Sequence, residues 1–226
     1  CVCLALKCLK DIEHHGHLQA AELGLDRQTD LVTGPHNVLG LELNEYAAEL
    51  ARVTVWIGEL QWRIDHGYEF KTNPVLEPLD HIECRDALLT WADDKAMEAD
   101  WPAADVVVGN PPYVRQELIA PALLGQYRKL YATLFDRADL YVPFIERSLA
   151  LLADGGQLAF ICADRWTRTT SGGPLRAVVS AGFHVRAYVD MTDTPAFESD
   201  VVADPAITLI ERAKAGATLV AQRPGA

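Results

Sequence analysis

The residues best suited to chemistry are Asn110, Pro111, Pro112 and Tyr113, which follow an apolar run over residues 105–109. This run is rich in β-branched residues and predicts a buried strand. Two consecutive prolines remove two backbone donors, so the site offers hydrogen-bond acceptors only. Fixed acceptors suit an NH2 substrate, because they favour a pyramidal, nucleophilic nitrogen, and Tyr113 can stack on a planar group. The alternative interpretation is an ordinary strand-ending turn.

The elements that must position this motif alternate between strands and helices. Apolar periodicity predicts helices over 3–23, 45–66, 140–152 and 174–181, and strands over 37–43, 81–84, 105–109, 157–162, 183–189, 206–210 and 218–222. We expect Gly155 and Gly156 to cap the helix before them, and residues 91–101 to form a polar connection. The pattern predicts an α/β fold with a doubly wound, mostly parallel sheet. Ligands bind at the carboxyl ends of such strands, which directs attention to Glu42, Asp86 and Asn110.

Composition limits the classes of protein to consider. The chain has 226 residues and a net charge of −12, which speaks against independent DNA binding because phosphate contacts need clustered Lys and Arg. No apolar run reaches the roughly 18 residues of a membrane span. Five cysteines without a regular framework favour a cytoplasmic protein. Cys1, Cys3 and Cys8 fit no zinc spacing, so we expect no metal site.

The motif and its setting resemble the N6-adenine-specific DNA methyltransferases of restriction-modification systems, which have the Rossmann-like class I methyltransferase fold. The segments 37–62 and 139–161 resemble the regions before and after the catalytic motif of the type IIG-like members of this family. The likeness extends from about residue 3 to about residue 212. By resemblance, the enzyme transfers a methyl group from S-adenosylmethionine to the N6 amine of adenine, held by Asn110 and Pro111.

The same resemblance assigns the cofactor site. Glu42 would accept hydrogen bonds from the ribose hydroxyls, and Leu43 would pack on the adenine. Asp86 would receive the exocyclic amine of that adenine, with Ala87 beside the ring. The alternative interpretations are an exposed acid at the end of a strand for Glu42 and an ordinary loop residue for Asp86.

A second aromatic residue is implied for the substrate base. Phe197 matches the position at which these adenine enzymes carry it, and with Tyr113 it would sandwich the extruded adenine. The alternative is an aromatic side chain that anchors a loop to the core.

The resemblance implies a first strand and a glycine-rich loop before the helix over 3–23, and a recognition domain, none of which we find within residues 1–226. We therefore interpret residues 1–226 as a single, incomplete catalytic domain, poorly active or inactive by itself. The full-length protein would bind double-stranded DNA in restriction-modification or phage defence, together with a restriction or specificity partner. The alternatives are a glutamine-amide protein methyltransferase and an inactive remnant that serves only for interaction or DNA positioning.

Overall fold

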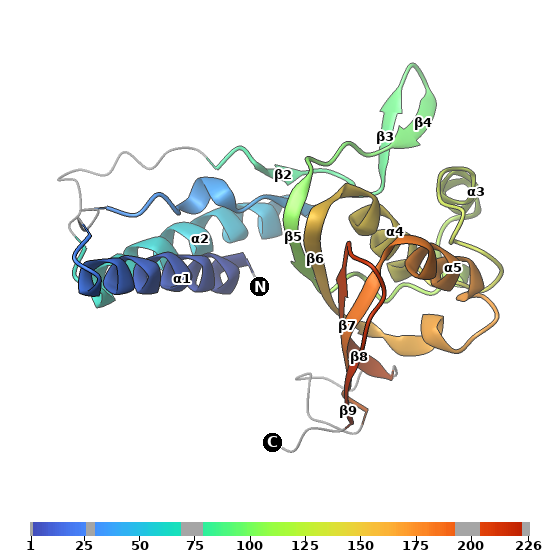
Figure 1. Cartoon of the computed structure of the whole chain (residues 1–226). Coiled ribbons are helices and arrows are strands. Elements are labelled where there is room, and N and C mark those ends of the chain that lie inside the picture. The colour runs from blue at the N-terminus through green and yellow to red at the C-terminus, as the bar shows by residue number, and fades with distance from the viewer. Residues whose placement is uncertain (1, 26–29, 69–78, 193–203, 223–226) are drawn as a thin grey trace. The chain divides into compact units, whose positions relative to one another are not determined.

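The computed structural model describes residues 2–25, 30–68, 79–192 and 204–222, and its chain divides into two compact units, residues 1–87 and 88–226 (Figure 1). Among the helices described, none combines the length and the apolar character that crossing a membrane requires.

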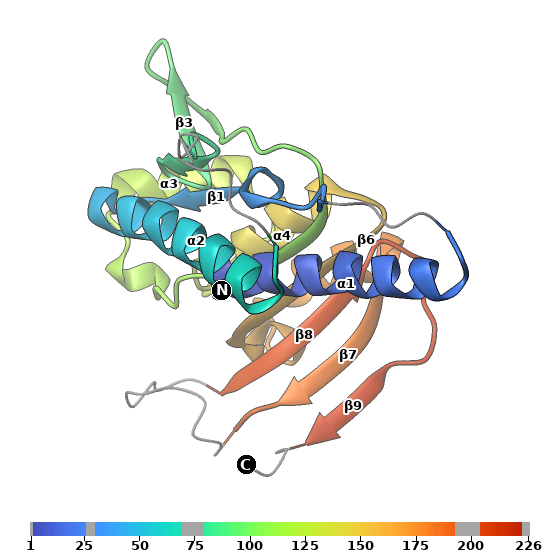
Figure 2. The same ribbon diagram turned by 90° about the vertical axis from the view of Figure 1, so that its left-hand side faces the viewer.

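In the first unit, two long helices lie side by side (Figure 2). They are α1 (Val2–Glu22) and α2 (Glu45–Asp65), and a 3-10 turn (Pro35–Asn37) and β1 (Gly40–Glu42) lie between them along the chain. The absence of a side chain at Gly58 permits the close approach of the helices, because a Cβ there would collide with the Cys3 sulfur. An apolar core joins the helices to the strands through Leu6, Val38, Val55, Leu79 and Ile82.

A buried charged network also ties α1 to α2. The Lys10 side chain is fully buried, and its Nζ lies 2.8 Å from Oε1 of Glu59 and 4.8 Å from the Trp62 ring centroid. Arg63 pairs with the same Glu59 oxygen at 2.6 Å and with Asp30 at 3.0 Å. Burial lowers the pKa of Lys10, and the Glu59 carboxylate opposes that shift. A lysine buried this deeply requires such a partner, so the network fixes how the two helices pack.

The second unit contains a five-stranded sheet with the order β5-β6-β8-β7-β9 (Figure 2). Its strands are β5 (Ala104–Gly109), β6 (Leu152–Ala163), β7 (His184–Asp190), β8 (Pro205–Glu211) and β9 (Leu219–Gln222). β5 is parallel to β6 and β9 is parallel to β7, whereas β8 runs antiparallel to both of its neighbours. The predicted α/β class is confirmed, with a mixed sheet because β8 is inserted in the reverse direction.

Two helices cover one face of this sheet, α4 (Tyr141–Leu151) and α5 (Gly173–Gly182) (Figure 1). Ile145 and Leu149 from α4 and Leu175 from α5 pack with Leu158 and Phe160 of β6 in one buried cluster. A third helix, α3 (Pro121–Leu130), follows a 3-10 turn at Gln116–Leu118 and had no counterpart in the sequence-based prediction.

Residues 91–101 differ from the connection expected there. They contain most of an antiparallel hairpin, formed by β3 (Leu89–Ala92) and β4 (Lys95–Glu98). Its two-residue turn, Asp93 and Asp94, has φ values of 47° and 60°. Asp tolerates this left-handed conformation better than most residues, which allows a tight hairpin without glycine.

Gly155 and Gly156 do not cap the preceding helix, because β6 begins at Leu152 and passes through them. Gly155 adopts φ +75°, and its N–H donates to the Arg212 carbonyl, while Arg212 N–H donates to the Gly156 carbonyl. The glycine pair thus belongs to an irregular stretch of strand, where its pairing with β5 also shifts register.

The strand over 105–109 forms as predicted, but it is not buried on both faces. Within the described residues β5 hydrogen-bonds to one strand only, β6. Val106 and Val108 share a face and are 56% and 46% exposed. The apolar run therefore marks an edge strand of this unit rather than a strand enclosed in its core.

Candidate active site

Asn110 and Pro111 stand at the carboxyl end of β5 with their acceptors unused. Asn110 is exposed and Pro111 is buried. Among the described residues, neither the Asn110 side chain nor the Pro111 carbonyl makes a hydrogen bond. Gly109 lets the strand end lie close to β6, since a Cβ there would come within 3.2 Å of the Phe160 ring. Within the described residues, both carbonyl oxygens are thus without a hydrogen-bond donor.

Tyr113 is anchored rather than free. Its hydroxyl donates to the Ile161 carbonyl at 3.0 Å, and its ring packs against the core. Ile161 lies one residue beyond the last pairing of β6 with β5, where the prolines have no N–H to continue the ladder. Burial raises the pKa of Tyr113 to about 12, so the phenol is neutral at physiological pH. Val114 then accepts a hydrogen bond from Leu140 N–H at 2.9 Å, which ties the motif to the start of α4.

A buried acid beside the motif was missed from the sequence. Asp164 follows β6 directly and is 6% exposed. One of its oxygens accepts from Arg168 at 2.7 Å and the other from the Tyr188 hydroxyl at 2.8 Å. Because both oxygens are engaged, Asp164 supports the strand end and does not act as a free base. The signal that could have found it is its place at the carboxyl end of the strand over 157–162.

Glu42 and Asp86 follow two paired strands of the first unit. β1 and β2 (Ile82–Cys84) are parallel, with Glu42 opposite Cys84, so their carboxyl ends lie at one edge. The Glu42 carbonyl accepts from Arg85 N–H at 2.9 Å, which places Asp86 at that edge. Oε1 of Glu42 accepts from Asn44 N–H at 2.9 Å, and Oε2 has no partner among the described residues.

The apolar neighbours assigned to the same site are also placed at this edge. Leu43 directly follows Glu42 and is 73% exposed, and Ala87 is half-buried beside Asp86. The edge thus combines a carboxylate oxygen with an available apolar side chain, a combination that a ribose and a planar ring can use. Phe197 lies outside the described residues.

The class of protein follows from this arrangement: a class I methyltransferase-type α/β fold that presents Asn-Pro-Pro-Tyr at the carboxyl end of a strand. A family model for the Eco57I restriction-modification methylase matches residues 36–197. The chain belongs to the Eco57I restriction-modification methylase family.

Named relatives agree with this assignment. The chain is 62% identical over 120 residues to the type II methyltransferase M.PaeR7I of Pseudomonas aeruginosa, covering 53% of this chain and 21% of that protein. It is 60% identical over 124 residues to the type II methyltransferase M.XhoI of Xanthomonas vasicola, covering 53% of this chain and 23% of the relative. The matched parts thus span about a fifth of the length of these relatives.

Among solved structures, the DNA complex of the type IIL restriction-modification enzyme MmeI shares the fold with a TM-score of 0.59 at 14% identity. The similarity covers 91% of this chain and 30% of MmeI. It supports the predicted fold class.

Proposed function

We propose that the protein containing this chain transfers a methyl group from S-adenosylmethionine to the N6 amine of adenine in double-stranded DNA, as the modification activity of a restriction-modification or phage-defence system. The observation that carries the proposal is the pair of acceptors at Asn110 and Pro111, at the carboxyl end of β5, that make no hydrogen bond within the described residues. The names of the related type II methyltransferases support the reaction class.

The two acceptors would act on the adenine amine. One N–H donates to Oδ1 of Asn110 and the other to the Pro111 carbonyl, which localises the lone pair on nitrogen instead of in the purine ring. The nitrogen held in this way would attack the methyl carbon that the cofactor supplies, and the electron pair of the broken carbon–sulfur bond would remain on sulfur. The proton lost from the methylated nitrogen passes to water. The prolines contribute by holding both acceptors still.

The residues at the β1–β2 edge fit the cofactor that this reaction requires. Oε2 of Glu42 can accept from a ribose hydroxyl. Asp86 lies at the same edge, where it would face the exocyclic amine, and Leu43 offers exposed apolar surface. S-adenosylmethionine supplies the electrophilic methyl group when it is bound. Tyr113 and Phe197 would stack on the extruded base, which replaces part of the cost of leaving the duplex.

We further propose that the two units act as one catalytic domain, because the family match crosses the boundary between Ala87 and Leu88. Double-stranded DNA is the proposed substrate, a restriction or specificity subunit the proposed partner, and the cytoplasm the proposed location.

The test uses the product of the complete reading frame that encodes these residues, expressed in a bacterial host without adenine methylation. Genomic DNA is digested to nucleosides and analysed by mass spectrometry. We expect N6-methyl-2′-deoxyadenosine from the unaltered protein and none above background from Asn110→Ala. Removing one preorganised polar group of this kind costs roughly 10²–10³ in kcat.

Asn110→Asp is the matched control, since it keeps an oxygen acceptor of nearly the same size and should retain partial activity. N4-methylcytosine, or methylation of protein glutamine without methylated DNA, would contradict the assignment of adenine. An Asn110→Ala variant as active as the unaltered protein would contradict the mechanism.

A further inference from the structure

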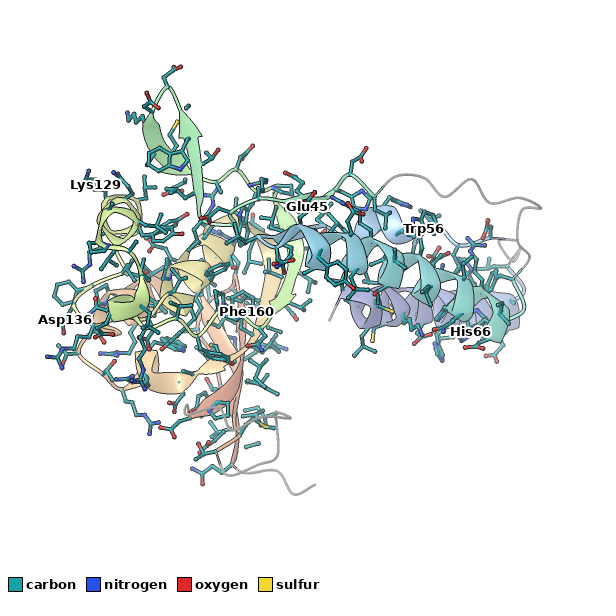
Figure 3. The ribbon with its side chains drawn as sticks, turned by 180° about the vertical axis from the view of Figure 1, so that it is seen from behind. Glu45, Trp56, His66, Lys129, Asp136 and Phe160 are labelled. Carbon is teal, nitrogen blue, oxygen red and sulfur yellow. The ribbon has the colours of Figure 1, made fainter. Side chains whose placement is uncertain are left out.

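An open hollow of about 540 Å³ lies on the surface of the second unit, beyond the catalytic motif. It is bounded by the 3-10 turn that follows the motif, the last turn of α3 and the loop after that helix. Figure 3 shows two residues of this region, Lys129 on α3 and Asp136 in the loop. Its lining includes Gln116, Arg128, Phe135, Asp136 and Arg137.

The two arginines in the hollow keep their charge unpaired. Arg128 donates to Oε1 of Gln116 at 2.6 Å and to the Asp136 carbonyl at 2.8 Å, and both of these acceptors are uncharged. These bonds fix the guanidinium without neutralising it. Arg137 is exposed, and within the part of the chain that the structure describes it makes no hydrogen bond or ion pair. The hollow is therefore lined by one guanidinium held in place, that of Arg128, and one that is available to a ligand, that of Arg137.

The loop that presents Arg137 is built with a special backbone conformation. Asp136 has φ +51°, in the left-handed region. Asp enters that region at modest cost, and the bond from Arg128 to its carbonyl holds the turn. Phe135, directly before it, is 53% exposed. An exposed aromatic ring beside two guanidinium groups matches a ligand that combines anionic phosphate with an apolar sugar or base.

Local charge agrees with an anionic ligand. Residues 113–137 carry four basic and two acidic side chains, a net charge of +2 in a chain whose total is −12. These side chains are Arg115, Glu117, Arg128, Lys129, Asp136 and Arg137. Of the described residues that line the hollow, Asp136 alone carries a carboxylate, so the two arginines give this lining a net positive charge.

The hollow is close to the motif along the chain. Gln116 follows Asn110 by six residues, which limits their separation to roughly 22 Å. At 3.4 Å per nucleotide along a strand, that distance corresponds to about six nucleotides. A DNA strand whose adenine reaches Asn110 therefore has backbone phosphates within range of the hollow.

The geometry points to a phosphate-binding site for the DNA backbone in this hollow, in which Arg128 and Arg137 hold a phosphodiester near the target adenine and Phe135 packs on the adjoining nucleotide. The inference rests on the proposed function and adds the residues by which the catalytic domain itself holds its substrate. It locates a positive site in a chain whose overall charge is strongly negative.

The experiment measures binding of a fluorescein-labelled 30-base-pair duplex by the complete protein, without cofactor, at NaCl concentrations from 50 to 200 mM. We expect Arg128→Gln and Arg137→Gln each to reduce the slope of log K against log salt by about 0.9, the loss of one phosphate contact. Arg137→Lys should keep the slope, because it keeps the charge. Lys95→Gln, on the exposed hairpin strand β4, removes one positive charge elsewhere and should leave the slope unchanged.

Slopes for Arg128→Gln and Arg137→Gln equal to that of Lys95→Gln would overturn the site, as would an unaltered protein that does not bind the duplex. Saturable binding of inorganic phosphate with unchanged duplex slopes would also overturn it, by assigning the hollow to a small anion. Adenine methylation, measured in parallel, separates the two proposals. Reduced slopes without methylation would support the site and contradict methyl transfer, whereas methylation with unchanged slopes would do the reverse.

Discussion

Replacing Tyr113 by phenylalanine should separate the anchoring of the catalytic motif from its proposed stacking role. The change keeps the ring and removes only the hydroxyl that donates to the Ile161 carbonyl at 3.0 Å. That carbonyl lies beyond the end of the β5–β6 ladder, so no backbone N–H of β5 replaces the lost donor. The variant should therefore be less stable, while the ring remains able to stack.

The expected loss is about 1–2 kcal/mol, from one net hydrogen bond and a carbonyl left partly unsatisfied. For a unit of this size that corresponds to a fall in Tm of roughly 3–8 °C. Urea unfolding followed by tryptophan fluorescence measures the difference, because Trp166 is buried in the same core as Tyr113. Tyr46→Phe is the control: Tyr46 is 78% exposed, has no hydrogen bond among the described residues, and should be neutral.

The pH dependence gives a second readout of the same bond. The pKa of Tyr113 is raised from its ordinary value of 10 to about 12 by burial. The folded state thus retains the phenol proton more firmly than the unfolded state. This contribution to stability is complete below pH 10 and is lost as pH rises through 12. The difference in free energy of unfolding between the unaltered chain and Tyr113→Phe should therefore narrow between pH 10 and pH 12. If the two free energies agree within about 0.3 kcal/mol at pH 8, the anchoring role is refuted.

Two further predictions concern other parts of the chain. Glu42→Gln should weaken S-adenosylmethionine binding about 10-fold to 100-fold in calorimetry, because it removes a charge-assisted hydrogen bond. Glu45→Gln, in the exposed first turn of α2, should leave the affinity unchanged. Equal affinities of the two variants would contradict the assigned ribose contact. Burial raises the pKa of Cys162 to about 12, so its thiolate fraction at pH 8 is about one in 10⁴. Iodoacetamide followed by mass spectrometry should modify the exposed Cys84 and leave Cys162 unmodified, and similar rates would contradict this burial.

Predictions from sequence succeeded where the signal is local. The β-branched run over 105–109 and the prolines after it specify a strand and its end within a few residues, so the position of β5 was predicted correctly. The apolar periodicity of residues 45–66 likewise identified α2, whose start is fixed by the Asn44 side chain accepting from Ala47 N–H at 3.0 Å. Neither feature depends on distant parts of the chain.

The failures depend on contacts between distant residues. Gly155 and Gly156 fit a helix cap equally well by local pattern, and only their bonds with Arg212, more than 50 residues away, show that they belong to a strand. The hydrogen bond from Tyr113 to Ile161 spans 48 residues and leaves no local signal. The hairpin was missed because Asp93 and Asp94 supply its turn in place of the Asn-Gly pair that usually marks one.

The same structural rule applies within each of the two units. In the first unit, Glu42 and Asp86 follow parallel strands at their carboxyl ends. In the second unit, Asn110 and Asp164 follow β5 and β6, which are also parallel. When two strands are parallel, their carboxyl ends lie at the same edge of the sheet. Backbone groups there have no partner in the ladder, so side chains or ligands must hydrogen-bond to them. At the end of β5 the two prolines stop the ladder, and the Tyr113 hydroxyl donates to the Ile161 carbonyl of β6 just beyond that point.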